Sequence, residues 1–170
     1  RAQRLEMPYE EVRGEDLVQA ALTQLDETIR RTGARIQVAT NFPSFRVNKT
    51  WVTQALYNLI ANALKFHQPG RVPEIDLAPF WLTQDSHTQV GIVVRDRGIG
   101  VEPDHAQRIF QLFQRAVGRE VGGTGAGLAI VQQVAQRHGG RTWVQSREGG
   151  GSEFVLLFGS QSLVDEKPAT

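Results

Sequence analysis

Residues 48–67 have the sequence NKTWVTQALYNLIANALKFH, and this stretch decides the fold that we expect for the rest of the chain. At 100° per residue it predicts an amphipathic helix, with Asn48 as its N-cap. Its apolar stripe consists of Val52, Leu56, Leu59, Ile60, Ala63 and Leu64. Beside that stripe, Asn58, Asn62 and Lys65 fall within a sector of about 60°. One helix therefore carries two carboxamides and one ammonium on a common face.

The polar face of this helix has the chemistry of a metal and phosphate site. An amide oxygen is a neutral, hard ligand suited to Mg²⁺, and a lysine ammonium is a point charge suited to a phosphate. The alternative is a solvated helix face, and for Asn58, Asn62 and Lys65 taken alone it is the better interpretation. The rest of the chain decides between the two.

Composition and charge narrow the class of protein. With 170 residues, 40% of them hydrophobic and 22% charged, the chain fits one compact domain. Its net charge of +1 and the lack of a long basic run argue against a sequence-independent nucleic-acid binder. Without cysteine, neither a disulfide nor a thiolate metal site can form. No apolar run approaches the ~20 residues that span a bilayer, so we expect no membrane segment and a cytoplasmic location.

The order of apolar patterns and breakers predicts the elements. We expect a linker over residues 1–14, one domain over residues 15–158 and a polar tail over residues 159–170. Because the chain opens on Arg1 and not on Met, we expect it to be a piece of a longer protein. The expected helices cover 16–32, 48–66, the segment after Pro103 up to 113, and 125–138. The expected strands cover 35–40, 45–47, 74–83, 90–96, 141–146 and 153–158, with Pro79 at an edge or bulge position.

Asp96 ends the most informative strand. A period of two places it on the same side as Val90, Ile92 and Val94. Burying a carboxylate costs several kcal/mol unless a donor reaches it, and the exocyclic amine of a purine is one such donor. The alternative is an Asp that starts the turn 96–100, a common local use of this residue. On this strand alone the two interpretations are evenly balanced.

A glycine-rich segment precedes the helix expected at 125–138. Five glycines with almost no apolar anchors predict a segment that is mobile until a ligand orders it: Gly118, Gly122, Gly123, Gly125 and Gly127. Thr124 is a candidate N-cap, which would turn the first N–H groups of the helix toward an anion. The alternative is a plain flexible connection. Two common nucleotide motifs are excluded, because Pro103 occupies the third glycine position of a Rossmann fingerprint and no lysine follows a glycine as in a P-loop.

Four segments in order resemble the N, G1, F and G2 boxes of sensor histidine kinases, which belong to the gyrase, chaperone, histidine kinase and mismatch-repair superfamily of ATPases. They are NLIANALKF at 58–66, DRGIG at 96–100, IFQLF at 109–113 and GTGAGLAI at 123–130. The resemblance covers residues 15–158. It implies an α+β fold of the Bergerat type, a two-layer α/β sandwich in which a mixed sheet packs on helices.

The resemblance also implies roles for single residues. Asn62 would be the main Mg²⁺ ligand, helped by Asn58, and Lys65 would contact phosphate. Phe66 would lie against the adenine, and Asp96 would accept its amine. The glycines of the G1 box would let the backbone approach the base, and those of the G2 box would form a lid over the triphosphate. The remaining residues of the implied ATP site are Gly98, Gly100, Phe110, Phe113, Gly123, Thr124, Gly125, Gly127 and Leu128.

Three functions remain open at this stage. The first is the catalytic domain of a histidine kinase, which binds Mg-ATP or ADP and transfers the γ-phosphate to a histidine on a separate dimerisation and histidine-phosphotransfer domain. That domain would then pass the phosphate to a response regulator. The others are a hydrolytic ATPase of the superfamily, whose members carry Glu at the position of Asn58, and a degenerate nucleotide-binding module.

The histidines of the chain argue against self-phosphorylation. The resemblance implies an acceptor histidine followed by an acidic residue, and none of the four has one: His67, His87, His105 and His138. We therefore expect the isolated chain not to autophosphorylate. The stretches 138–146 and 149–154 also resemble kinases attached to PAS or phytochrome-type sensors, which would make the whole protein a photoreceptor, although no residue here predicts a chromophore site.

Overall fold

The computed structural model describes residues 8–102, 110 and 125–164. The elements in chain order are β1 (Glu10–Arg13), α1 (Gly14–Gln24), α2 (Asp26–Thr32), β2 (Arg35–Val38), β3 (Ser44–Val47), α3 (Lys49–Lys65), β4 (Glu74–Gln84), β5 (His87–Asp96), α6 (Gly125–Arg137), β6 (Arg141–Ser146), β7 (Ser152–Leu157) and the 3₁₀ turn η1 (Ser160–Ser162). In this part of the chain, no helix combines the length and the apolar character needed to cross a bilayer.

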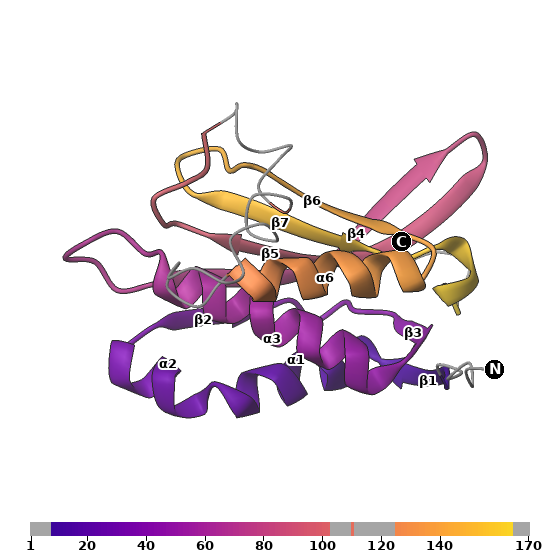
Figure 1. The fold of residues 1–170 in the computed structure, drawn as a ribbon, viewed down its shortest axis with the longest axis horizontal. Helices are drawn as coiled ribbons and strands as arrows, with labels where there is room; N and C mark the ends of the chain where they lie inside the picture. Colours follow the sequence, from indigo (N-terminus) through magenta and orange to yellow (C-terminus); the bar gives the residue numbers. More distant parts are fainter. Residues whose placement is uncertain (1–7, 103–109, 111–124, 165–170) are drawn as a thin grey trace.

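The fold has two layers. A five-stranded sheet has the order β2-β4-β5-β7-β6, in which β2 and β4 are parallel and all other neighbours are antiparallel. The helices lie together on one face of this sheet (Figure 1). Strands β1 and β3 form a separate two-stranded sheet. The predicted two-layer α/β sandwich with a mixed sheet is confirmed.

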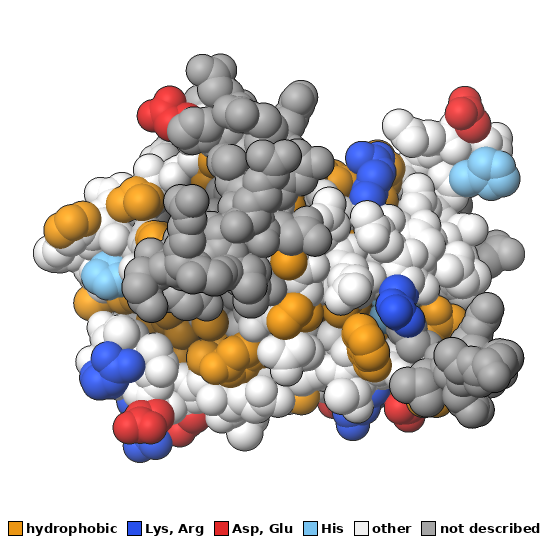
Figure 2. Space-filling model, viewed as in Figure 1, with side chains coloured by type: hydrophobic (Ala, Val, Ile, Leu, Met, Phe, Trp, Pro, Cys, Tyr) orange, Lys and Arg blue, Asp and Glu red, His pale blue; other side chains and the backbone are white. Residues whose placement is uncertain are grey.

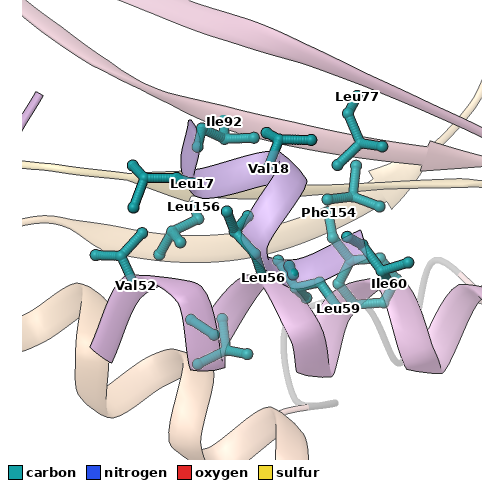
Figure 3. Packing of buried hydrophobic residues seen from close by; sticks show 14 of the residues in the cluster. Leu17, Val18, Val52, Leu56, Leu59, Ile60, Leu77, Ile92, Phe154 and Leu156 are labelled. Atoms are coloured by element: carbon teal, nitrogen blue, oxygen red, sulfur yellow. The ribbon is translucent and has the colours of Figure 1, made fainter. Parts of the chain in front are cut away.

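Helix α3 is the centre of the helical layer, as its sequence predicts. The side chain of Asn48 accepts a hydrogen bond from the backbone N–H of Trp51 at 2.8 Å and so caps the helix. Its predicted apolar stripe is buried throughout, with no member more than 4% exposed. Figure 3 shows Leu56, Leu59 and Ile60 pointing into the core that the sheet closes from the other side. At ~1.5–3 kcal/mol for each large apolar side chain, this stripe fixes α3 against the sheet.

The single helix expected over residues 16–32 is wrong, because the structure has two helices there. The backbone leaves the helical conformation at Leu25, whose φ is −107° and ψ is 12°. Leu25 is buried at this bend, whereas no residue of α2 is fully buried. Burial of one side chain at the bend therefore overrides a continuous helical pattern. The predicted end of the segment is confirmed by Gly33, which adopts φ +72° after α2.

Secondary structure is also present on both sides of residues 15–158. Residues 10–13, expected in a linker, form β1 and pair with β3, which buries Val12. At the other end, Ser162 is buried and Leu163 forms a bridge with Phe45. The division into linker, domain and tail stays a prediction.

The β4–β5 hairpin explains how a proline fits into a long strand. Strand β2 pairs with β4 only as far as Leu77, so Pro79 lies where β4 has β5 as its one neighbour. A proline cannot donate to a second neighbouring strand, and the predicted edge position is confirmed. Asp85 and Ser86 close the hairpin with φ of +51° and +68°.

Candidate functional site

A pocket of about 150 Å³ opens where the C-terminal half of α3, the loop after β5 and the start of β7 meet. It is lined by Asn62, Phe66, Asp96, Ile99, Gly100, Val101, Ser152 and Phe154. The structure thus brings together four of the predicted site residues, although Asn62 and Asp96 belong to different layers. The pocket is smaller than the roughly 300–1,000 Å³ of typical ligand sites, so it suits one planar ring system, with any charged groups of the ligand outside it.

Asp96 lines the pocket and is only 8% exposed. Its Oδ1 accepts hydrogen bonds from the backbone N–H groups of Gly98 at 2.8 Å and Ser152 at 3.2 Å. Asp96 therefore starts the turn, as one interpretation of the sequence expects, and its side chain also faces inward. Among the described residues none donates to Oδ2, which leaves an acceptor for a ligand.

Burial shifts the pKa of this carboxyl. Desolvation raises the pKa of Asp96 above its usual value of 3.8. The two backbone N–H groups and the positive charge of Arg147 oppose that effect, because each stabilises the ionised form. Desolvation thus favours the neutral carboxyl, whereas its hydrogen bonds and Arg147 favour the carboxylate.

Gly98 has a structural task that the sequence did not indicate. A Cβ at Gly98 would clash with the carbonyl oxygen of Phe66, and the N–H of Ile99 donates to that same oxygen at 3.1 Å. Gly98 therefore lets the loop after β5 dock on the C-terminal end of α3. Gly100 adopts φ +83°, a conformation that favours glycine, and lines the pocket itself.

Asn62 presents an unpartnered acceptor. Its Oδ1 is buried and has no hydrogen-bond partner in the part of the chain that the structure describes. Leaving a buried acceptor unpaired costs about 1–3 kcal/mol, so we expect a ligand to bind this oxygen. A divalent cation fits this position, because a carboxamide oxygen is a neutral, hard ligand.

Asn58 and Lys65, the other two residues of the predicted polar face of α3, do not line the pocket. Asn58 lies against the first turn of α6, where its Nδ2 approaches the carbonyl oxygen of Gly127 at 3.4 Å. Lys65 is exposed, and its Nζ lies 5.8 Å from the ring centroid of Phe66. The three residues of the polar face therefore have different surroundings. Asn62 lines the pocket, Asn58 contacts α6, and Lys65 is an exposed cation beside Phe66.

The remaining predicted residues are placed as follows. Leu128 is buried in the core and does not line the pocket. Phe110 is also buried and packs edge-on against Phe154 with ring centroids 6.3 Å apart, so it supports the pocket wall from behind. Gly125 is the first residue of α6. Phe113, Gly123 and Thr124 lie outside the described residues, as does most of the glycine-rich segment expected to be mobile.

Residues 47–161 match the family model described as histidine kinase-, DNA gyrase B-, and HSP90-like ATPase. The chain belongs to this family. The superfamily inferred from the four sequence boxes is thereby confirmed.

The curated proteins similar to this chain include a histidine kinase and a phytochrome-like protein. The chain is 36% identical over 152 residues, or 89% of its length, to the methanogenesis regulatory histidine kinase FilI of Methanothrix harundinacea. It is also 36% identical over 143 residues, or 84% of its length, to the phytochrome-like protein Cph1 of Synechocystis. The chain spans only 17% of the first protein and 18% of the second.

The fold of this chain is also found in a solved structure. Full-length ShkA in complex with AMPPNP superimposes with a TM-score of 0.74 at 28% identity, covering 99% of this chain and 34% of that one.

Four of the residues that line the pocket were not predicted from the sequence: Ile99, Val101, Ser152 and Phe154. Ser152 and Phe154 reach the pocket because β7 pairs with β5, which sets Ser152 opposite Asp96. The available signal was the run Gly149 to Gly151, which marks a turn where another backbone approaches closely. Indeed, a Cβ at Gly151 would clash with the carbonyl oxygen of Asp96.

His138 has a structural role, in line with its expected place at a helix end. It is fully buried, its Nε2 accepts the backbone N–H of Asn48 at 3.1 Å, and its Nδ1 lies 2.8 Å from the carbonyl oxygen of Val134. The ring is therefore neutral, with the proton on Nδ1. It joins the end of α6 to the start of α3, and it is inaccessible as a phosphate acceptor.

On the face drawn in Figure 2, the Lys and Arg side chains of the described residues lie apart from one another and form no continuous basic patch.

Proposed function

We propose that this chain is the ATP-binding catalytic domain of a sensor histidine kinase. It binds Mg-ATP or ADP and transfers the γ-phosphate to a histidine on a separate helical domain of the same full-length protein. The proposal rests on two acceptors that face one pocket. They are Oδ2 of the buried Asp96 and Oδ1 of Asn62, and no described residue donates to either of them.

The pocket has the acceptor and the walls that adenine requires. Oδ2 of Asp96 would accept the exocyclic amine, while Oδ1 remains occupied by two backbone N–H groups. Phe66, Val101 and Phe154 supply apolar surface around the ring. The pocket is large enough for the base alone, so the phosphates would lie outside it, near Lys65 and the start of α6.

The residues around the phosphates fit a magnesium nucleotide. Asn62 would hold Mg²⁺ through its unpartnered Oδ1, with Asn58 one helical turn earlier as the second carboxamide. When bound, Mg²⁺ neutralises charge on the phosphate oxygens. Lys65 adds a cation at the rim, and α6 begins at Gly125 with N–H groups that lack partners within the helix. ShkA, solved with AMPPNP, supports nucleotide binding by this fold.

Asn58 favours phosphoryl transfer over hydrolysis. A hydrolase of this superfamily would need a carboxylate at this position to activate water, and a carboxamide cannot take up that proton at neutral pH. This chain would therefore position ATP, and the acceptor domain would supply the base. We propose that its partners are a dimerisation and phosphotransfer domain of the same full-length protein and a response regulator. We also propose a cytoplasmic location, where ATP is available. The likeness to Cph1 supports a phytochrome-type or PAS-linked sensor.

The deciding experiment uses γ-labelled ATP. The chain is incubated alone and then with a separately prepared acceptor domain of the same protein, and acid-labile label is measured on each. We expect label on the acceptor only when this chain is present. Label on this chain alone would contradict the proposed division of labour. No label in either tube, together with tight ADP binding, would favour the nucleotide-binding module instead.

A further inference from the structure

The turn between β6 and β7, residues 147–151, controls one wall of the pocket. The residue that follows it, Ser152, donates its backbone N–H to Oδ1 of Asp96 at 3.2 Å. Ser152 and Phe154 also line the pocket. The position of this turn therefore determines how Ser152 and Phe154 of β7 lie relative to the carboxylate of Asp96 on β5.

The backbone of the turn is poorly constrained by itself. Gly149, Gly150 and Gly151 have φ of +88°, +110° and +104°, and three successive glycines lose more conformational entropy on ordering than any other residues. Two backbone hydrogen bonds lie within the turn, from the N–H of Arg147 to Gly151 at 3.0 Å and from that of Gly150 to Arg147 at 2.9 Å. Side chains must supply much of the remaining order.

Arg97 holds the turn from outside. Its Nη1 donates to the carbonyl oxygen of Glu148 at 2.8 Å and to that of Gly150 at 3.1 Å. Bonds from a guanidinium are charge-assisted and stronger than neutral ones. The guanidinium also lies directly against Gly149, where a Cβ would come within 2.8 Å of Nη1. Two consecutive residues therefore contact this part of the chain: Arg97 holds the middle of the turn, and Asp96 accepts the N–H of Ser152 directly after it.

Arg147 anchors the start of the turn on the sheet. Its Nη2 forms an ion pair with Oδ2 of Asp76 on β4, and the two side chains are only 14% and 30% exposed. Partial burial limits the screening of this pair by solvent. The turn is thus fixed at its first residue by Arg147 and over its glycines by Arg97.

We propose that Arg97 is a positioning residue for base recognition. It fixes the glycine turn so that the N–H of Ser152 stays on Oδ1 of Asp96, which keeps Oδ2 directed at the exocyclic amine of the base. The inference rests on the proposed nucleotide binding and adds a determinant of base specificity that does not touch the nucleotide. Without Arg97 the turn samples other conformations, and Oδ1 of Asp96 keeps only the hydrogen bond from the N–H of Gly98, which orients the carboxylate less strictly.

Calorimetric titration with two nucleotides tests this role. Mg-ADP presents the 6-amino group, whereas purine riboside diphosphate lacks it. We expect Arg97→Ala to weaken ADP binding by about three- to tenfold, the range of one or two modest hydrogen bonds, and to change purine riboside diphosphate less. Arg97→Lys should recover part of the preference, because an ammonium can still donate to one carbonyl. Arg31→Ala, at an exposed position on α2, is the matched control and should leave both affinities unchanged.

Two glycine variants decide the question if Arg97→Ala does not fold. Gly149→Ala and Gly150→Ala both place a side chain at positive φ, but only the first pushes on the guanidinium, because the space around Gly150 is open. Positive φ strains the turn in both variants, so we expect Gly149→Ala, which also displaces the guanidinium, to reduce the preference for ADP more than Gly150→Ala does. Equal preferences in both glycine variants, or an unchanged preference in Arg97→Ala, would overturn the inference while ADP still binds the parent. A parent that binds neither nucleotide would overturn the proposed function as well.

Discussion

Replacing Asp96 by Asn should separate nucleotide recognition from folding. In the folded chain Oδ1 accepts two backbone N–H groups, and an amide oxygen can keep both. The amide nitrogen then takes the place of Oδ2 and presents a donor where the adenine amine also presents one. Losing that hydrogen bond and leaving two donors opposed costs about 1–3 kcal/mol, or roughly a five- to 150-fold rise in Kd.

The same substitution should leave the stability of the ligand-free domain unchanged or increase it. Burial raises the pKa of Asp96, which means that the folded chain resists the ionised form at neutral pH. A neutral isostere removes that cost, so we expect the thermal midpoint of Asp96→Asn to be equal to or above that of the parent. The exposed Asp16→Asn serves as the control for loss of a charge.

The assay is calorimetric titration with Mg-ADP and with purine riboside diphosphate, combined with thermal unfolding without ligand. The penalty of Asp96→Asn should be large for ADP and small for the purine lacking the amine. An Asp96→Asn variant that binds ADP as tightly as the parent would refute the assignment. Equal penalties for both nucleotides would show that the substitution acts on the pocket as a whole and not on the amine.

Four further outcomes are expected. Asn62→Ala should leave the free energy of unfolding unchanged or raise it, because it removes a buried acceptor that has no partner among the described residues, yet abolish the Mg²⁺-dependent part of ATP affinity in titrations with and without the cation. Gly98→Ala should destabilise the chain by about 1–3 kcal/mol in urea unfolding, since its Cβ meets the Phe66 carbonyl. Burial lowers the pKa of His138 below its usual 6.5, so the unfolded chain takes up a proton that the folded chain resists. Stability should therefore be full above pH 6.5 and fall as the pH drops below it, and His138→Gln should flatten that slope in urea unfolding. Finally, steady-state ATP hydrolysis by the chain should stay far below about 1 s⁻¹, the lower end of ordinary enzyme turnover, and a faster rate would favour the hydrolase.

The sequence by itself determined the features that depend on near neighbours along the chain. The helix at 49–65 and its Asn48 cap follow from residues within a few positions of one another, so periodicity predicts them. The inward direction of Asp96 follows from the period of two in its own strand. The ordered boxes then indicated the family, and with it a two-layer sandwich in which these elements pack.

Tertiary structure alone decided which predicted residues meet. Periodicity places Asn58, Asn62 and Lys65 on one face, but the neighbouring loop and α6 decide that only Asn62 lines the pocket. The pairing of β5 with β7 brings Ser152 to Asp96 across 56 positions of sequence, and no local pattern encodes that register. Likewise, the break at Leu25 depends on what that side chain packs against. Local propensities reach only a few residues, whereas burial and strand pairing join distant ones, and the pocket is built at such junctions.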